Sequence, residues 1–197
     1  MRRLLFVTHA EVVIDPEVPV TEWSLLPEGR ARHEAFSARV TQIASVWSSD
    51  ETKARDGADI LAACLGLTPR VLPALHENDR SATGYLPPPE FEATADAFFS
   101  NPAQSIRGWE RAIDAQARCI RALTEVIAAS PGGDIAVVAH GGIGALLRAH
   151  VLKVPIDRSH DQPSGGGGHV MVLGLPDWTL LHDWQRIEQF EERAYDI

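Results

Sequence analysis

Short apolar runs alternate along this chain with segments whose apolar positions recur at helical spacing. The runs at residues 4–8 and 135–140 are apolar and β-prone, as in strands that are buried on both faces of a sheet. Similar runs predict four more strands, the last at a sheet edge, at residues 46–49, 71–75, 170–175 and 179–184. Helices are predicted at residues 27–44, 51–65, 89–99, 108–129 and 141–151. This alternation indicates one α/β domain over residues 1–197, with a mostly parallel sheet and helices on both faces.

Two segments interrupt the alternation. Residues 11–22 are rich in Pro, Val and Asp and are interpreted as a loop. Residues 161–168, with the sequence DQPSGGGG, form a connection before the fifth predicted strand. The backbone N–H groups of such a glycine run can form an anion-binding nest, which is one interpretation. A plain flexible connection is the preferred interpretation, because glycine-rich composition is typical of flexible links.

Chemically reactive residues gather at the carboxyl ends of the predicted strands. His9 closes the first strand and His140 the fourth, while Lys53 follows the second and Glu77 the third. In an open parallel sheet these ends share one rim, where ligands bind. A neutral imidazole is a good nucleophile toward phosphorus, and a carboxylic acid can protonate a leaving alkoxide. A second histidine and a lysine can stabilise charge on phosphoryl oxygens, so the set predicts phosphoryl transfer.

Four short motifs carry a resemblance to a known family. They are, in chain order, Thr8-His9-Ala10-Glu11, Ser48-Ser49-Asp50-Glu51-Thr52-Lys53-Ala54, Leu75-His76-Glu77 and Val138-Ala139-His140-Gly141-Gly142. Their order and spacing resemble the histidine phosphatase (phosphoglycerate mutase-like) superfamily, whose pattern is Arg-His-Gly, Ser-Ser-Pro-x-x-Arg-Ala, Leu-x-Glu and His-Gly. The resemblance extends from Leu4 to about Leu175 and implies the phosphoglycerate mutase-like α/β fold. Without a large insertion, the chain is more similar to the small phosphatases of the family than to its glycolytic mutases.

The resemblance implies a role for each matching residue. His9 would be the nucleophile that becomes phosphorylated, and His140 would stabilise the phosphoryl group during transfer. Glu77 would donate a proton to the leaving group and later act as the base for water. Lys53 would take the place of a phosphate-binding arginine.

The phosphate pocket departs from the family pattern. Thr8 and Lys53 stand where the family has arginines, and Ala10 replaces a glycine. Arginine binds phosphate through a planar fork of donors, whereas lysine offers a compact charge and a hydroxyl offers none. Losing one charge-assisted hydrogen bond costs roughly 1.5–3 kcal/mol, so turnover is expected to be weakened and not abolished. Arg80 follows closely after Glu77 and is a further candidate phosphate-binding residue beside Thr8 and Lys53.

The remaining candidates are assigned structural roles. His33 and Arg107 are predicted to lie on the surface, and alternation along the strand would turn His76 away from the pocket. Cys64 and Cys119 lie within helical patterns beside apolar residues, so both are predicted to be buried free thiols in a reducing cytosol. The five tryptophans are interpreted as packing residues.

The amino-acid composition limits the classes of partner that this chain is expected to bind. The 197 residues include 27 acidic and 18 basic ones, a net charge of -9, which argues against nucleic acid and anionic membranes as partners. No stretch predicts a leader or a membrane span, so a cytoplasmic location is expected. Neither a Cys-x-x-Cys nor a close histidine spacing is present, so no metal and no cofactor are expected. The sequence leaves open whether the protein forms a homo-oligomer.

The preferred hypothesis is a phosphomonoesterase that works through a phosphohistidine, without metal, on a small phosphorylated metabolite or a phosphoprotein. The alternative is a degenerate, non-catalytic family member that binds a phosphorylated ligand or a protein partner. Thr8 and Lys53 favour the alternative, whereas the intact set of His9, Glu77 and His140 favours the enzyme, since binding alone requires neither a nucleophile nor an acid.

Overall fold

The computed structural model describes residues 1–130 and 132–192. Its strands form one six-stranded sheet in the order β3-β2-β4-β1-β5-β6. The strands are β1 (Arg2–Thr8), β2 (Ile43–Ser48), β3 (Arg70–Val71), β4 (Asp134–Ala139), β5 (His169–Leu175) and β6 (Thr179–Arg186). The α-helices are α1 (Pro27–Ser37), α2 (Thr52–Leu65), α3 (Pro88–Ser100), α4 (Ala112–Ala129) and α5 (Gly141–Leu152). The predicted α/β class is confirmed.

The sheet is parallel through four strands and antiparallel at one side. β1 pairs with β4, β4 with β2 and β2 with β3, all in parallel. β5 is antiparallel to β1, and β6 is antiparallel to β5. Only a short turn joins β5 to β6, whereas a parallel pair needs a long crossover connection. β6 lies at the edge of the sheet, as the sequence predicted.

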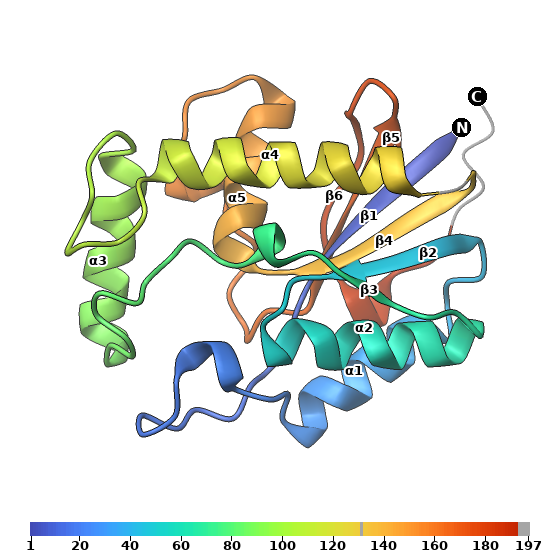
Figure 1. Ribbon diagram of the computed structural model, residues 1–197, viewed down its shortest axis with the longest axis horizontal. Coiled ribbons are helices and arrows are strands. Elements are labelled where there is room, and N and C mark those ends of the chain that lie inside the picture. Colours follow the sequence, from blue (N-terminus) through green and yellow to red (C-terminus); the bar gives the residue numbers. More distant parts are fainter. Residues whose placement is uncertain (131, 193–197) are drawn as a thin grey trace.

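Helices cover both faces of the sheet. Leu4 and Phe6 of β1 pack in the same apolar cluster as α4 and α5. Leu5 and Val7, which alternate with them, pack with α1 and α2. Figure 1 shows α4 along one side of the strands and α1 and α2 along the other. Because β1 is buried on both faces, its sequence reads as an unbroken apolar run.

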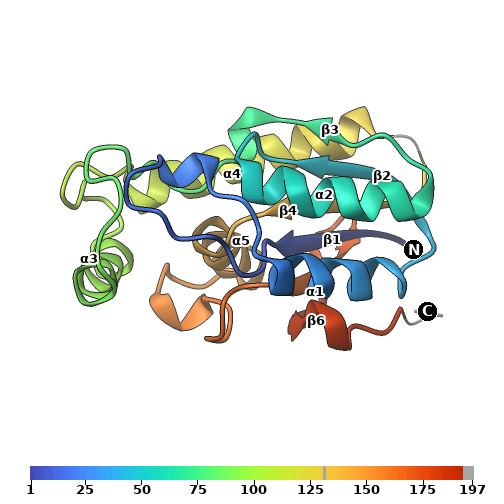
Figure 2. The ribbon, with the colours of Figure 1, turned by 90° about the horizontal axis from the view of Figure 1, so that it is seen from below.

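A third apolar cluster lies beyond the carboxyl ends of the parallel strands. Phe98 and Phe99 of α3 pack there with Trp109, and the cluster reaches Ala145 and Leu146 of α5. Figure 2 shows β1 running from the N-terminus toward the end of the molecule where α3 lies. α3 and the loops beside it therefore cover the rim to which the reactive residues were assigned.

Two of the predicted boundaries around the first half of the sheet are wrong. The third strand, predicted at 71–75, covers only Arg70–Val71 and is followed by a 3-10 turn at Pro73–Leu75. Pro73 has no N–H to donate to a neighbouring strand and a fixed φ, which favours the turn. The first helix, predicted to reach residue 44, ends at Ser37, and β2 begins already at Ile43. Residues 40–43 include Val, Thr and Ile, whose branched side chains favour extended backbone.

Two further expectations need correction. The long helix begins at Ala112 and not at Gly108, because Arg107 and Gly108 have positive φ values of 52° and 85°, which a helix cannot contain. Cys119 is buried as predicted, but Cys64 is exposed. Within the described residues, no helix is both long and apolar enough to cross a membrane.

Candidate active site

His9 comes directly after β1, and its main chain is held on both sides. Its N–H donates to the carbonyl oxygen of Ala139 at 3.0 Å, and its own carbonyl oxygen accepts from the Gly168 N–H at 2.8 Å. The ring Nδ1 lies 2.9 Å from the carbonyl oxygen of Ala10. Since a carbonyl oxygen only accepts, Nδ1 carries the proton of the neutral ring and Nε2 presents a lone pair. Burial and then the nearby His140 lower the pKa of His9 to about 3, so the ring is neutral at pH 7.

His140 follows β4 and precedes the first residue of α5. Its ring is fully buried, and the ring centroid lies 5.4 Å from that of His9. Nε2 lies 2.8 Å from the hydroxyl oxygen of Ser49, which follows β2. Nδ1 is buried and has no hydrogen-bond partner among the described residues. A buried nitrogen without a partner is costly, so a phosphoryl oxygen beside His9 is a suitable ligand for it.

Glu77 follows the 3-10 turn Pro73–Leu75, and the start of α5 holds its carboxylate. Oε2 accepts from the Gly142 N–H and Oε1 from the Ile143 N–H, each at 2.9 Å. The Arg80 guanidinium lies 3.3 Å from Oε2. Burial raises the pKa of this carboxyl, but Arg80, His140 and the backbone N–H groups outweigh burial and bring the pKa below its usual range. The residue predicted to be the proton donor is therefore ionised in the free protein at neutral pH.

A second buried carboxylate, Glu51, connects three of the predicted site residues. Its Oε2 lies 2.5 Å from Lys53 Nζ. Its Oε1 accepts from the Glu77 N–H at 2.9 Å and lies 3.4 Å from His140 Nε2. Burial raises the pKa of Glu51, but His140 and Lys53 together lower it to about 2. Sequence reasoning missed Glu51, although an acidic residue inside the Ser-Ser…Lys-Ala segment was an available signal.

The three candidate phosphate-binding residues differ in how they meet the site. Lys53 is 4% exposed and has its charge balanced by Glu51, so its binding of phosphate stays a prediction. Thr8 is fully buried, and its hydroxyl hydrogen bonds within the protein. Arg80 lies beside the carboxylate of Glu77, with its guanidinium carbon 5.0 and 5.1 Å from the ring centroids of Phe91 and Trp109. Cation–π contact with both rings fixes the orientation of this cation.

One cavity of about 190 Å³ brings the reactive groups to a common space. His9, Glu77 and Arg80 line it, together with Gly141 and Gly142 at the start of α5 and aromatic residues of the α3 region. His140 and Lys53 are outside this lining, His140 with its ring against His9 and Lys53 joined through Glu51. In the part of the chain that the structure describes, no group of three or more His, Cys, Asp or Glu side chains could hold a metal ion.

His33 supports the segment after His9, and its predicted surface position is wrong. It is 1% exposed, and its Nε2 accepts a hydrogen bond from the Ala10 N–H at 3.3 Å. Its ring packs against Gly57 of α2, where a Cβ atom would lie 2.7 Å from the ring. Burial first, and then nearby arginines, lower the pKa of His33 to about 4, so it stays a neutral acceptor at pH 7. A glycine inside a helix signals such close approach, but it does not name the partner.

The glycine run of residues 165–168 packs against the nucleophile candidate. All four glycines have positive φ, between 65° and 121°. The Gly168 N–H donates to the His9 carbonyl oxygen, so this N–H is not available to an anion. At Gly167 a Cβ atom would lie only 2.3 Å from the same oxygen. The segment interpreted as a flexible connection therefore makes a close backbone contact that only glycine permits.

Gly167→Ala is expected to cost both stability and turnover, because the added methyl group must push away the main chain of His9. Gly66→Ala is the matched control, since Gly66 also has a positive φ, of 67°, with nothing within 4 Å of its Cβ position. The control should lose about 1–2 kcal/mol of unfolding free energy from the left-handed backbone alone. Gly167→Ala should lose more unfolding free energy, and its turnover should fall by about tenfold or more as His9, the candidate nucleophile, shifts. Thermal melts and steady-state rates of both variants measure this, and equal losses would contradict it.

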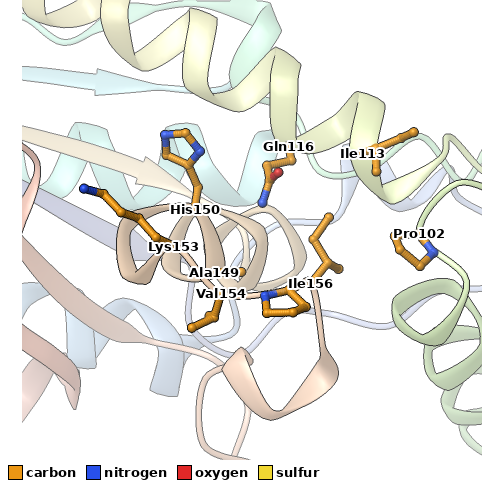
Figure 3. A pocket seen from close by; sticks show the side chains of 9 residues that line it. Pro102, Ile113, Gln116, Ala149, His150, Lys153, Val154 and Ile156 are labelled. Carbon is orange, nitrogen blue, oxygen red and sulfur yellow. The ribbon is translucent and has the colours of Figure 1, made fainter.

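A larger hollow of about 530 Å³ lies elsewhere, between α4, α5 and the segment that follows α5. Figure 3 shows Gln116 and Ile113 on one wall and His150, Lys153 and Ile156 on the other. Its walls contain no carboxylate and none of the predicted site residues. Chemistry, and not size, therefore selects the smaller cavity as the candidate active site.

Known proteins similar to this chain match it along most of its length. Glucosyl-3-phosphoglycerate phosphatase from Mycobacterium tuberculosis (strain ATCC 25618 / H37Rv) is 31% identical over 157 residues, which cover 73% of this chain and 67% of the relative. The structure of mycobacterial glucosyl-3-phosphoglycerate phosphatase in complex with inorganic phosphate matches with a TM-score of 0.75 at 23% identity, covering 95% of this chain and 99% of that one. Bacillus stearothermophilus YhfR matches with a TM-score of 0.79 at 20% identity, over 95% of this chain and 100% of that one.

These two structural matches show a shared fold, and the match to a family sequence profile shows the family. The profile described as histidine phosphatase superfamily (branch 1) matches residues 4–177, which contain all four motifs and every candidate site residue. The chain belongs to the histidine phosphatase superfamily, branch 1.

Proposed function

We propose that this protein is a metal-independent phosphomonoesterase that acts through a phosphohistidine on a small phosphorylated substrate. The observation that carries the proposal is the arrangement of His9. Its Nδ1 proton is held by the Ala10 carbonyl oxygen, so the lone pair of Nε2 is free in a ring that shares its cavity with Glu77. A neutral imidazole with a free nitrogen needs no separate base to attack phosphorus.

In the first step, Nε2 of His9 attacks phosphorus and the bond from phosphorus to the ester oxygen breaks. Protonated Glu77 gives its proton to the departing oxygen, so an alcohol leaves and Glu77 becomes a carboxylate. In the second step, a water molecule attacks the phosphohistidine, and Glu77 takes the proton of that water. The nitrogen–phosphorus bond breaks, inorganic phosphate leaves, and His9 and Glu77 return to their starting states. His140, through its unpaired Nδ1, stabilises the charge on the phosphoryl oxygens.

Glu77 has to gain a proton before the first step, because its pKa in the free protein is lowered. A phosphate monoester loses its second proton near pH 6, so a monoanionic substrate can bring the proton into the cavity. The incoming negative charge also competes for Arg80, the cation that favours ionised Glu77. Substrate binding therefore shifts Glu77 toward its protonated form at the point where the acid is needed.

The mycobacterial relative supplies a candidate substrate. It is a glucosyl-3-phosphoglycerate phosphatase. We therefore include glucosyl-3-phosphoglycerate in the panel of phosphate esters whose turnover by this protein is measured. The cavity of about 190 Å³ is smaller than the roughly 300–1,000 Å³ of pockets for drug-sized ligands, so the panel also includes esters with much smaller leaving groups.

The proposal is tested by trapping the intermediate. The protein is mixed with a ³²P-labelled activated phosphate ester in the presence of a chelator and quenched within one turnover. We expect one labelled site, His9, with an adduct that is lost in acid and retained in alkali. Turnover that needs an added metal ion, or a label on another residue, would refute the mechanism. Saturable binding of inorganic phosphate without adduct or turnover would identify the non-catalytic alternative.

A further inference from the structure

Thr8, the residue beside the nucleophile, holds a side chain from a distant segment. Its hydroxyl oxygen accepts a hydrogen bond from the main-chain N–H of His169 at 2.9 Å. The same hydroxyl donates its single proton to Oε1 of Gln162 at 2.6 Å. This distance is typical of an O–H···O bond. His169 Nδ1 lies 3.2 Å from the same Oε1 and donates to it when the neutral ring carries its proton on Nδ1. In that tautomer the amide oxygen is held from two directions.

With its oxygen held by Thr8 and His169, the amide nitrogen of Gln162 points to the opposite side. There it lies against Gly141, where a Cβ atom would be only 2.4 Å from Nε2. Gln162 also lines the cavity that contains His9, Glu77 and Gly142. The structure gives Nε2 no hydrogen-bond partner within the described residues, although its oxygen makes two contacts. An oriented donor with no partner inside a cavity is suited to an acceptor on the ligand.

We propose that Gln162 is a substrate-binding residue whose Nε2 donates a hydrogen bond to a phosphoryl oxygen, and that Thr8 and His169 are the positioning residues that orient it. The inference rests on the proposed function for the identity of the ligand. Position 8 has a short hydroxyl where the family pattern has an arginine, and the Gln162 amide lies directly beyond that hydroxyl. A neutral donor thus replaces a charged one at the first motif.

The charge of the surroundings fits a neutral donor. Lys53 is balanced by Glu51, and Arg80 lies next to Glu77. Arg158, which also lines the cavity, pairs with Glu92 and Asp96, so each of these three cations has a carboxylate partner. A neutral amide adds a directional hydrogen bond to the phosphate without changing the net charge of the site. Thr8 and His169 are 0% and 1% exposed, so both positioning residues are fixed by packing.

The test compares Gln162→Ala and the isosteric Gln162→Glu with the wild type in two measurements. The first is binding of inorganic phosphate, measured by titration calorimetry and as competitive inhibition. The second is kcat/KM for esters with different leaving groups. Gln162→Ala should weaken phosphate binding about tenfold, the equivalent of one hydrogen bond, and should lower kcat/KM by the same factor for every ester. Gln162→Glu should weaken both more, because a carboxylate repels the phosphoryl oxygens. Ser164→Ala, an exposed position of the same loop, is the control and should change neither.

The positioning role is tested separately at Thr8. Thr8→Val keeps the shape but removes the hydroxyl, so it should weaken phosphate binding in the same direction as Gln162→Ala. Thr8→Ser keeps the hydroxyl and should restore most of the binding that Thr8→Val loses. In the double variant Thr8→Val with Gln162→Ala, the two effects should not add, because both remove the same donor.

Two results would overturn the inference. In the first, Gln162→Ala leaves phosphate binding unchanged but lowers kcat/KM by a factor that differs between leaving groups. This result would place Gln162 beside the leaving group and not beside the phosphoryl group. Full additivity in the double variant would separate Thr8 from Gln162. Phosphate binding is measurable even if the protein proves to have no turnover, so failure of the proposed function and failure of this inference are distinguishable.

Discussion

His9→Ala should lower turnover of every phosphate ester by at least about 10⁴-fold, because removal of the attacking nucleophile in covalent catalysis costs this much or more. The variant should also form no acid-labile adduct with the labelled ester. Loss of the ring removes the bond to the Ala10 carbonyl oxygen and the edge contact with the His140 ring, whereas the backbone contacts to Ala139 and Gly168 should persist. Inorganic phosphate should therefore still bind to the variant, within about tenfold of the wild type.

His150→Ala is the matched control for this variant. His150 is an exposed histidine of α5 that lines the larger hollow, so its loss tests whether that hollow takes part in the reaction (Figure 3). We expect unchanged rates for His150→Ala and a native melting curve for both variants. Turnover that survives His9→Ala, or that falls with His150→Ala, would show that the nucleophile lies elsewhere.

The elements that could be predicted from the sequence are those whose signal is local. β1 and β4 were predicted within two residues, because both are buried on both faces and read as unbroken apolar runs. The end of α2 was predicted at Leu65 because Gly66 supplies the left-handed residue that closes it, with φ of 67°. Strand direction is not local information. The antiparallel pairing of β5 follows from its position next to β1, which the order of elements along the chain does not specify.

The same limit applies to the site. His9, Glu77 and His140 could be predicted as site residues because each follows an element that ends at the rim, and a motif marks each of them. Gln162 escaped notice because its contact with Thr8 spans 154 residues. His33 escaped because its helix gave no sign that this residue would face Gly57 and the main chain of Ala10. Buried polar residues depend on partners that only the folded chain brings near, so their role cannot be read from their neighbours in sequence.

Glu77→Gln should show which steps of the reaction depend on proton transfer by Glu77. With an alkyl phosphate, whose leaving group is a poor one, kcat/KM should fall by about 10²–10⁴-fold, because general acid catalysis contributes this much. With p-nitrophenyl phosphate, whose leaving group needs no proton, kcat/KM should change by less than about tenfold. The second step still needs a base for water, so kcat should fall for both esters. With p-nitrophenyl phosphate, for which the first step stays fast, the phosphohistidine should accumulate as a burst.

The control for Glu77→Gln is Glu51→Gln, which alters a buried carboxylate of the site that lies outside the cavity lining. Glu51 is outside the lining of the cavity, and its two carboxylate oxygens face Lys53, His140 and the Glu77 N–H, so it is not placed to protonate a leaving group. Its variant should change the rates of the two esters by the same factor. A Gln side chain at position 77 loses one acceptor for the N–H groups of Gly142 and Ile143, so melting curves must first show a folded variant. If Glu77→Gln lowers kcat/KM equally for both esters in a folded protein, Glu77 positions the helix and does not supply the proton.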